Sequence, residues 1–164
     1  MELDIVVKKG YGESLAGTRA GDRDEELDAV RQYIRTAVSI IVPNRNDVKV
    51  TTINTVLREY GLGCATHLHC QTHCCDLTRM PAVTKALMAL DITSCDLVIA
   101  RGRLGVPGSG SMLVFLDAKG RLLTAGISPS HVVHRKPVAD AVRDEMVMAL
   151  ERIGFTRCQG TDRL

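Results

Sequence analysis

Apolar side chains recur at steps of three and four between residues 24 and 42, and this spacing predicts an amphipathic helix. Asp22 and Glu25 resemble a capping box at its start. Pro43 is expected to end the helix because proline has no amide hydrogen to donate. Similar spacing predicts three further helices, over residues 54–60, 81–90 and 137–153.

Short apolar runs without helical spacing predict strands. Four such strands are expected, at residues 3–7, 48–51, 64–70 and 97–100. Residues 8–21 are rich in glycine and predict a flexible loop. Residues 112–116 and 122–127 flank the turn at 117–120, and this is the clearest hairpin pattern in the chain.

The alternation of these strands and helices around one antiparallel hairpin predicts an α/β fold. We expect a single domain over residues 1–164, with a mixed central sheet and flanking helices. The 164 residues are 45% hydrophobic and 24% charged, which is typical of one folded domain. No internal repeat or second domain is evident.

The charge balance argues against a nucleic-acid partner. Lys and Arg number 21 against 19 Asp and Glu, a formal net charge of only +2. Aromatic residues make up 3% of the chain and Trp is absent, so stacking on single strands is not expected either.

The hydropathy pattern argues against a membrane partner. The most apolar run, residues 37–42, is far shorter than the about 20 residues that a spanning helix needs. The start Met1-Glu2-Leu3-Asp4 has acids where a secretory signal has basic residues. We therefore expect a cytoplasmic protein, in which cysteines are free thiols or metal ligands.

Three segments carry residues suited to phosphate. Residues Thr51-Thr52-Ile53-Asn54 are expected between a strand and a helix, where amides favour an anion, although the same residues also cap helices. The loop Arg101–Ser111 combines glycines, serines and two arginines, which suits a polyphosphate, although such a loop can also be only a turn. Residues Ser128–Lys136 gather two imidazoles and two cations, which suits a ligand but is also typical of a solvated turn.

A fourth segment, Cys64–Asp76, is dense in Cys and His. A strand there would place His67 and His69 on one face and Cys64 and Cys70 on the other. The spacing matches no known zinc module, so buried thiols with ordinary histidines and a transition-metal site both stay open.

The first three segments together resemble a known family. The chain resembles the HcgB family of archaeal methanogens in the segments Thr51–Asn54, Arg101–Ser111 and Ser128–Lys136. The resemblance covers nearly the whole chain. That resemblance implies a homodimer with a fold similar to inosine triphosphate pyrophosphatases. Thr52-x-Asn54 and His134-Arg135-Lys136 are themselves similar to patterns of those pyrophosphatases, which have glycine in place of Ile53 and lysine in place of Leu57.

The resemblance also implies an activity. HcgB proteins are guanylyltransferases in the biosynthesis of the iron-guanylylpyridinol cofactor of iron hydrogenase. They join GMP from GTP to the hydroxyl of a substituted pyridinol and release pyrophosphate, and Mg²⁺ is expected to neutralise the phosphates.

Carried onto this chain, the resemblance assigns roles to individual residues. Arg101 and Arg103 would stabilise the leaving pyrophosphate, and His131 is the candidate base. Asp96 or Asp91 is expected to offer Mg²⁺ a carboxylate. Phosphates and the rest of the substrates would be bound by Thr51, Thr52, Asn54, Gly102, Gly105, Gly108, Ser109, Gly110, Ser111, Ser128, Ser130, His134, Arg135 and Lys136.

Two other classes of function stay open from the residues themselves. One is a nucleoside triphosphate pyrophosphatase, which needs only a nucleotide and Mg²⁺. The other is a metal-carrying or redox module built on residues 64–76.

Overall fold

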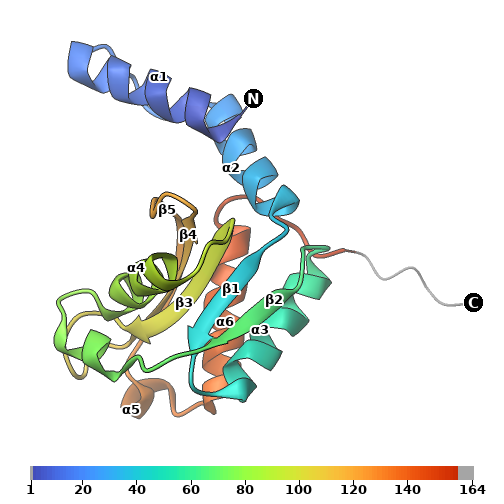
Figure 1. Cartoon of the computed structure of the whole chain (residues 1–164), viewed down its shortest axis with the longest axis vertical. Helices are drawn as coiled ribbons and strands as arrows, with labels where there is room; N and C mark the ends of the chain where they lie inside the picture. The colour runs from blue at the N-terminus through green and yellow to red at the C-terminus, as the bar shows by residue number, and fades with distance from the viewer. Residues whose placement is uncertain (1, 159–164) are drawn as a thin grey trace, which may run out of the picture. The chain divides into compact units, whose positions relative to one another are not determined.

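The chain divides between Ala37 and Val38 into two compact units, and the computed structural model describes residues 2–158 of it. The first unit contains two helices, α1 (Leu3–Ala16) and α2 (Asp24–Thr36). The second contains the sheet and the remaining helices (Figure 1). No helix in the described part of the chain is long and apolar enough to cross a membrane.

The expected strand at 3–7 and loop at 8–21 are wrong, because residues 3–16 form α1. Its buried residues Leu3, Val6 and Gly10 recur at helical spacing, which so short an apolar run did not reveal. The helix ends at Gly17, whose φ of 70° is a left-handed conformation that glycine adopts without strain.

The start of α2 lies one residue later than the expected capping box. Glu26, not Glu25, accepts a hydrogen bond from a preceding backbone amide, that of Arg23 at 2.9 Å. Arg19 also binds the Glu26 carboxylate at 2.9 Å, and this hydrogen bond lowers the pKa of Glu26 to about 2. Arg23 also forms an ion pair with Glu13 of α1 at 3.0 Å, which ties the start of α2 to the first helix.

Within the described residues, the second unit is built on a five-stranded sheet of order β2-β1-β3-β4-β5. Strands β2, β1 and β3 are parallel, and β4 and β5 are added antiparallel to β3. The strands are β1 (Ile40–Asn44), β2 (Ala65–His69), β3 (Leu97–Arg103), β4 (Ser111–Asp117) and β5 (Leu122–Ser128). The expected mixed sheet with one antiparallel hairpin is confirmed.

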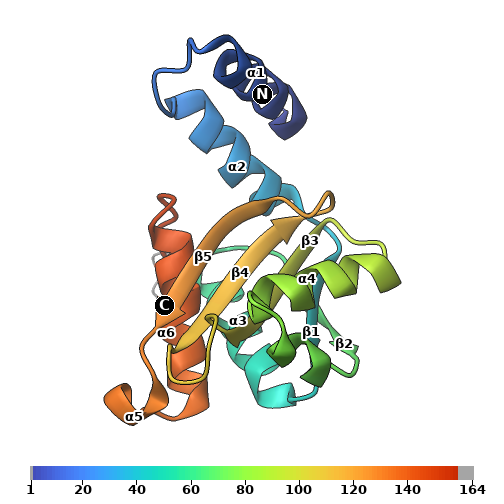
Figure 2. The same ribbon diagram turned by 90° about the vertical axis from the view of Figure 1, so that its left-hand side faces the viewer.

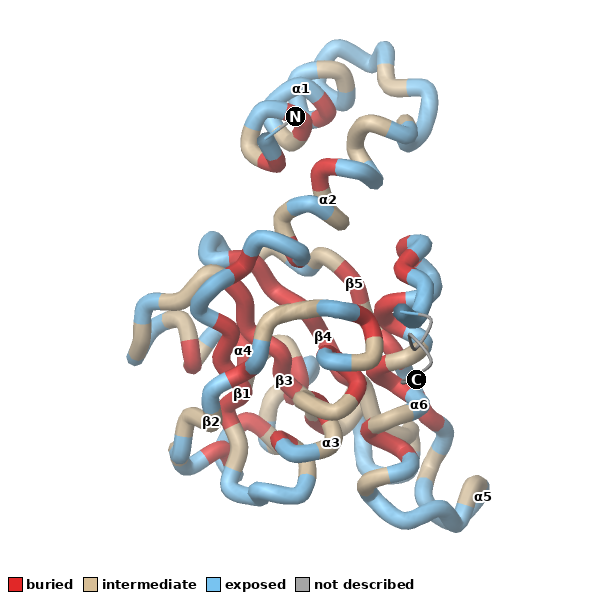
Figure 3. Tube along the Cα trace, turned by 90° about the vertical axis from the view of Figure 1, so that its right-hand side faces the viewer, coloured by how far each residue is buried: buried red, intermediate tan, exposed pale blue. Residues whose placement is uncertain are grey.

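Helices cover both faces of this sheet (Figures 1 and 2). Helix α4 (Pro81–Ile92) packs on β3 and β4, where its alanines allow close approach to buried valines and leucines. Helices α3 (Asp47–Glu59) and α6 (Val138–Glu151) pack against each other on the opposite face. Two short helical turns, η1 (His73–Leu77) and α5 (His131–His134), lie in connections. Figure 3 shows the resulting core as a buried band along the strands.

Two further expected elements are wrong. The helix predicted over 24–42 stops at Thr36, and residues 40–44 form the central strand β1. Pro43 lies beyond Ile41, where the register with β3 ends, and it is aligned only with Leu68 of β2. The strand predicted at 48–51 lies inside α3, whereas the expected helices at 54–60, 81–90 and 137–153 are confirmed within α3, α4 and α6.

A glycine sets how closely α6 approaches β5. A Cβ at Gly126 would lie 1.9 Å from the main-chain oxygen of Glu145. No side chain fits at that distance, so glycine lets the helix rest directly on the strand. This approach brings the Glu145 side chain to the open end of the hairpin, where Ser111 and Ser128 lie.

Candidate functional site

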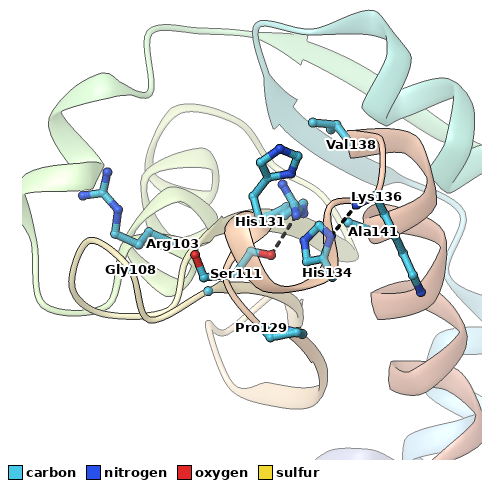
Figure 4. Close-up of a pocket in the computed structure, with 12 residues that line it drawn as sticks. Arg103, Gly108, Ser111, Pro129, His131, His134, Lys136, Val138 and Ala141 are labelled. Carbon is cyan, nitrogen blue, oxygen red and sulfur yellow. Dashed lines mark hydrogen bonds between the residues drawn. The ribbon is translucent and has the colours of Figure 1, made fainter.

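A cavity of about 250 Å³ opens at the edge of the sheet where the parallel strands end. Ligands of open α/β sheets bind outside the carboxyl ends of the strands. The walls come from the end of β3, the loop 104–110, the segment 129–136 and the first turn of α6 (Figure 4). The lining residues are Arg101, Arg103, Gly108, Gly110, Ser111, Pro129, Ser130, His131, His134, Lys136, Val138 and Ala141.

The buried carboxylate of Glu145 lies behind the cavity lining and binds two of its residues, Arg101 and Ser111. Glu145 is fully buried and accepts hydrogen bonds from Nε and Nη2 of Arg101, both at 2.9 Å. The Ser128 hydroxyl donates to it at 3.0 Å and that of Ser111 at 3.2 Å. Ser111 in turn accepts from Arg101 at 2.7 Å. Three side chains, from β4, β5 and α6, therefore fix the Arg101 guanidinium in place, two by direct hydrogen bonds and Ser128 through Glu145.

His131 and His134 form the side of the cavity away from Arg103. Their ring centroids lie 5.4 Å apart in an edge-on arrangement, and Figure 4 shows Arg103 on the loop side, with its guanidinium directed away from them. His134 Nδ1 accepts the backbone N–H of Lys136 at 2.9 Å, so a neutral His134 carries its proton on Nε2. The Lys136 ammonium lies 2.6 Å from Asp144, which raises the pKa of Lys136.

Further cations surround Arg101. Burial, followed by the positive charges of Arg101 and Lys85, lowers the pKa of Lys49. Lys85 lies 3.4 Å from the main-chain oxygen of Arg101 and 3.6 Å from the Asp76 carboxylate. Cations held this close together repel one another, and a bound polyanion would relieve that repulsion.

Replacing Lys49 by Met is expected to raise the free energy of unfolding of the free protein at pH 7, because it removes a partly buried ammonium close to two other cations. Folding lowers the pKa of Lys49, so at pH 7 its charge costs the folded state and not the unfolded chain. The gain should shrink as the pH rises through the lowered pKa towards the ordinary lysine value of 10.5.

Thermal unfolding at several pH values measures this effect, with the exposed Lys8→Met as the matched control. The control should change the stability little at any pH. A Lys49→Met protein less stable than the parent at pH 7 would contradict the assignment.

Comparison with known families shows the family of the chain. A family model described as FeGP cofactor biosynthesis protein HcgB, guanylyltransferase, matches residues 3–155 of the chain. The chain belongs to the HcgB family. The resemblance read from the three segments is therefore confirmed, and the match includes every residue that lines the cavity. As the family name states, HcgB proteins are guanylyltransferases of FeGP cofactor biosynthesis.

The cavity of this HcgB chain brings together residues from two of the segments singled out in the sequence. The loop after β3 and the segment before α6 face each other across it, although they are far apart in the chain. The expected site residues that line it are Arg101, Arg103, Gly108, Gly110, Ser111, Ser130, His131, His134 and Lys136.

The other expected residues of these two segments lie outside the lining. Gly102 is buried where a Cβ would lie 2.7 Å from an α4 backbone nitrogen. Ser109 accepts the N–H of Gly105 at 3.2 Å and so shapes the loop. Ser128 is occupied by Glu145. Arg135 is exposed and ends α5 with a φ of 50°.

The position expected for Thr51, Thr52 and Asn54 is wrong, because all three lie inside α3 and not at its start. The two Thr hydroxyls donate to main-chain oxygens one turn back, at 3.0 Å each. The Asn54 amide accepts the N–H of Ala65 at 2.7 Å and donates to its oxygen at 3.0 Å, which ties α3 to β2. The helix start that could favour an anion lies at Asn46.

The carboxylates expected for Mg²⁺ lie at the opposite end of the sheet from the cavity. Asp96 comes directly before β3 and accepts the backbone N–H groups of Val38 and Ser39 at 2.9 and 2.8 Å. Asp91 lies at the end of α4. β3 runs from this end to the cavity, so the structure does not bring either group to the proposed phosphates.

Sequence reasoning missed Glu145, Lys49 and Lys85. The sequence around Lys49 could have indicated its place near a strand end, because the apolar run 40–42 and the turn-forming Asn46 precede it. Glu145 is one of several acids on α6, and only its complete burial distinguishes it. No local pattern could have paired it with Arg101.

Proposed function

We propose that this chain transfers the GMP moiety of GTP to the hydroxyl of a substituted pyridinol and releases pyrophosphate. The observation that carries the proposal is a cavity lined by Arg101 and Arg103 in a chain of the HcgB family. Lys85 and Lys49 lie close to Arg101 and add positive charge beside it. Cations at fixed positions stabilise the charge that develops during nucleotidyl transfer.

In the proposed reaction the pyridinol oxygen attacks the α-phosphorus of GTP. A bond forms between that oxygen and phosphorus, and the bond from the α-phosphorus to the bridging oxygen of pyrophosphate breaks. Arg103 and the amides of Gly108 and Gly110 stabilise the leaving pyrophosphate on the loop side. His131 accepts the pyridinol proton on the histidine side, and His134 orients the acceptor.

The lining of the cavity does not fit a protein-held Mg²⁺. Among the described residues that line it, none is Asp or Glu, and the nearby Glu145 oxygens are taken by Arg101, Ser111 and Ser128. Mg²⁺ binds readily to nucleotide phosphates, so we propose that it enters with GTP.

A nucleoside triphosphate pyrophosphatase is the second candidate function. The pyrophosphatase pattern expected at Thr52–Asn54 requires an Asn after a strand and a Lys on the following helix. Asn46 caps α3 directly after β1, and Lys49 follows on the helix, so these two residues fit the pattern better. Such an enzyme would use water in place of the pyridinol and have the fold that the resemblance implies.

Product analysis distinguishes the two candidates. The protein is incubated with GTP and Mg²⁺, with and without the pyridinol, and the products are identified by mass spectrometry. Guanylylated pyridinol and pyrophosphate that form only with the acceptor support the transferase. GMP and pyrophosphate without acceptor would establish the pyrophosphatase instead, and no turnover in either mixture would overturn both.

The proposed homodimer and cytoplasmic location are separate from this chemistry. Light scattering during gel filtration measures the mass of the particle and tests the homodimer directly. A monomeric mass would contradict it without affecting the assignment of the cavity.

A further inference from the structure

A second group of metal-ligating side chains lies outside the cavity lining, beside the ends of β1 and β2. Asp47 begins α3, while His67 and His69 lie two residues apart on β2 and so share a face of the strand. One ligand atom from each of the three lies within 4.8 Å of the other two. Asp47 and His69 are exposed, and His67 is mostly buried.

The hydrogen bonds of His67 indicate which ring nitrogen is available to a cation. Its Nε2 lies 2.7 Å from the main-chain oxygen of Asn44, which can only accept, so Nε2 carries the proton. The lone pair of a neutral ring is then on Nδ1. Nδ1 lies 2.9 Å from a carboxylate oxygen of Asp47, so two lone pairs face each other. A cation between them, either a proton or a metal ion, is required.

The third side chain favours a metal ion over a proton. A proton would be shared by Asp47 and His67 alone and would not involve His69. The ring of His69 nevertheless lies close, with its centroid 3.6 Å from that of His67. A divalent ion uses all three groups. Metal-binding histidines usually donate their other N–H to a carbonyl or carboxylate, as Nε2 of His67 does to Asn44.

We propose that Asp47, His67 and His69 bind a divalent transition-metal ion such as Zn²⁺. Two imidazoles with one carboxylate suit such an ion, whereas Mg²⁺ and Ca²⁺ prefer oxygen alone. A tetrahedral ion with ligands at about 2.1 Å separates the ligand atoms by about 3.4 Å. To bind it, the Asp47 oxygen at 2.9 Å moves slightly away from Nδ1 of His67, and any pair of ligand atoms farther apart, at up to 4.8 Å, moves closer. The ion clamps the first turn of α3 to β2 and leaves a fourth position for an exogenous ligand.

This site differs from the Cys and His cluster that the sequence suggested. None of the four cysteines of residues 64–76 is among the three grouped side chains. The Cys64 thiol lies 3.4 Å from Asn54, away from the group of three. Asp47, which completes the set, lies outside residues 64–76.

The test is metal binding by the full chain without a histidine tag, followed with Co²⁺ by visible absorption and with Zn²⁺ by competition against a chelating dye. We expect one equivalent of metal and no sulfur-to-cobalt charge-transfer band. His69→Ala and Asp47→Asn should each weaken Zn²⁺ binding at least as much as loss of a ligand's hydrogen-bond partner does, about 10- to 100-fold.

The matched controls are His73→Ala and Cys64→Ser, which alter an exposed histidine and an exposed cysteine of the same segment. Both should bind Zn²⁺ as the parent does, and circular dichroism checks that all four variants are folded. Unchanged affinity in His69→Ala and Asp47→Asn, or a sulfur band that is lost in Cys64→Ser, would overturn the proposal. Because no nucleotide is used, this result is independent of the proposed transferase activity.

Discussion

Replacing Arg103 by Ala is expected to lower kcat for guanylyl transfer about 100- to 1,000-fold, the usual effect of removing one group that stabilises charge in the transition state. Arg103 lines the cavity at the end of β3, on the loop side where we place the leaving pyrophosphate. Its guanidinium reaches the main-chain oxygen of Asp76 only at 3.5 Å, so its removal should cost little stability. Steady-state kinetics and thermal unfolding measure the two effects.

Two further variants make the result specific for Arg103. Arg58→Ala removes an exposed arginine of α3 that is not part of the cavity lining, and its kcat should equal that of the parent. Arg103→Lys keeps the charge but not the planar fork, so its kcat should lie between those of the parent and the Ala variant. A kcat for Arg103→Ala within about twofold of the parent would remove Arg103 from the mechanism.

Replacing Glu145 by Leu is expected to lower the free energy of unfolding by about 3–5 kcal/mol, the usual cost of removing one partner of a buried ion pair. The change leaves the charge of Arg101, whose side chain is only 15% exposed, without its carboxylate. It also removes the acceptor of the Ser111 and Ser128 hydroxyls. Urea unfolding measures the loss.

A double variant separates the ion pair from the packing. In Arg101→Met/Glu145→Leu no charge is left unpaired, so the double variant should be more stable than Glu145→Leu alone. On the same helix, Asp144→Asn weakens only an exposed pair with Lys136 and should change the free energy of unfolding little. A Glu145→Leu protein that loses no more than Asp144→Asn would show that the buried pair does not stabilise the fold.

The elements that were predictable from the sequence are those whose local pattern agrees with their place in the fold. The strand pattern at residues 97–100 and the strand-turn-strand pattern around 117–120 do not also fit a helix. Helices over 81–90 and 137–153 have an apolar face that matches the face they bury.

The failures occur where the local pattern is ambiguous. Residues 37–42 continue the helical spacing of α2, but a central parallel strand is buried on both faces and needs no period of its own. Residues 48–51 contain β-branched side chains typical of strands, yet the Asn46 cap and packing on α6 make them helical. In both cases tertiary contacts outweigh a weak local preference.

The sequence by itself indicated the family of this protein, which the match over residues 3–155 confirms, and two segments that line its cavity, the glycine loop with two arginines and the histidine segment before the last helix. Only the tertiary structure decided which groups meet. Arg101 and Glu145 pair across 44 positions because strand order and the close approach at Gly126 bring α6 over β4 and β5, next to β3. A charge becomes buried, and a pKa is lowered, only when distant segments exclude water together, and no local pattern records that.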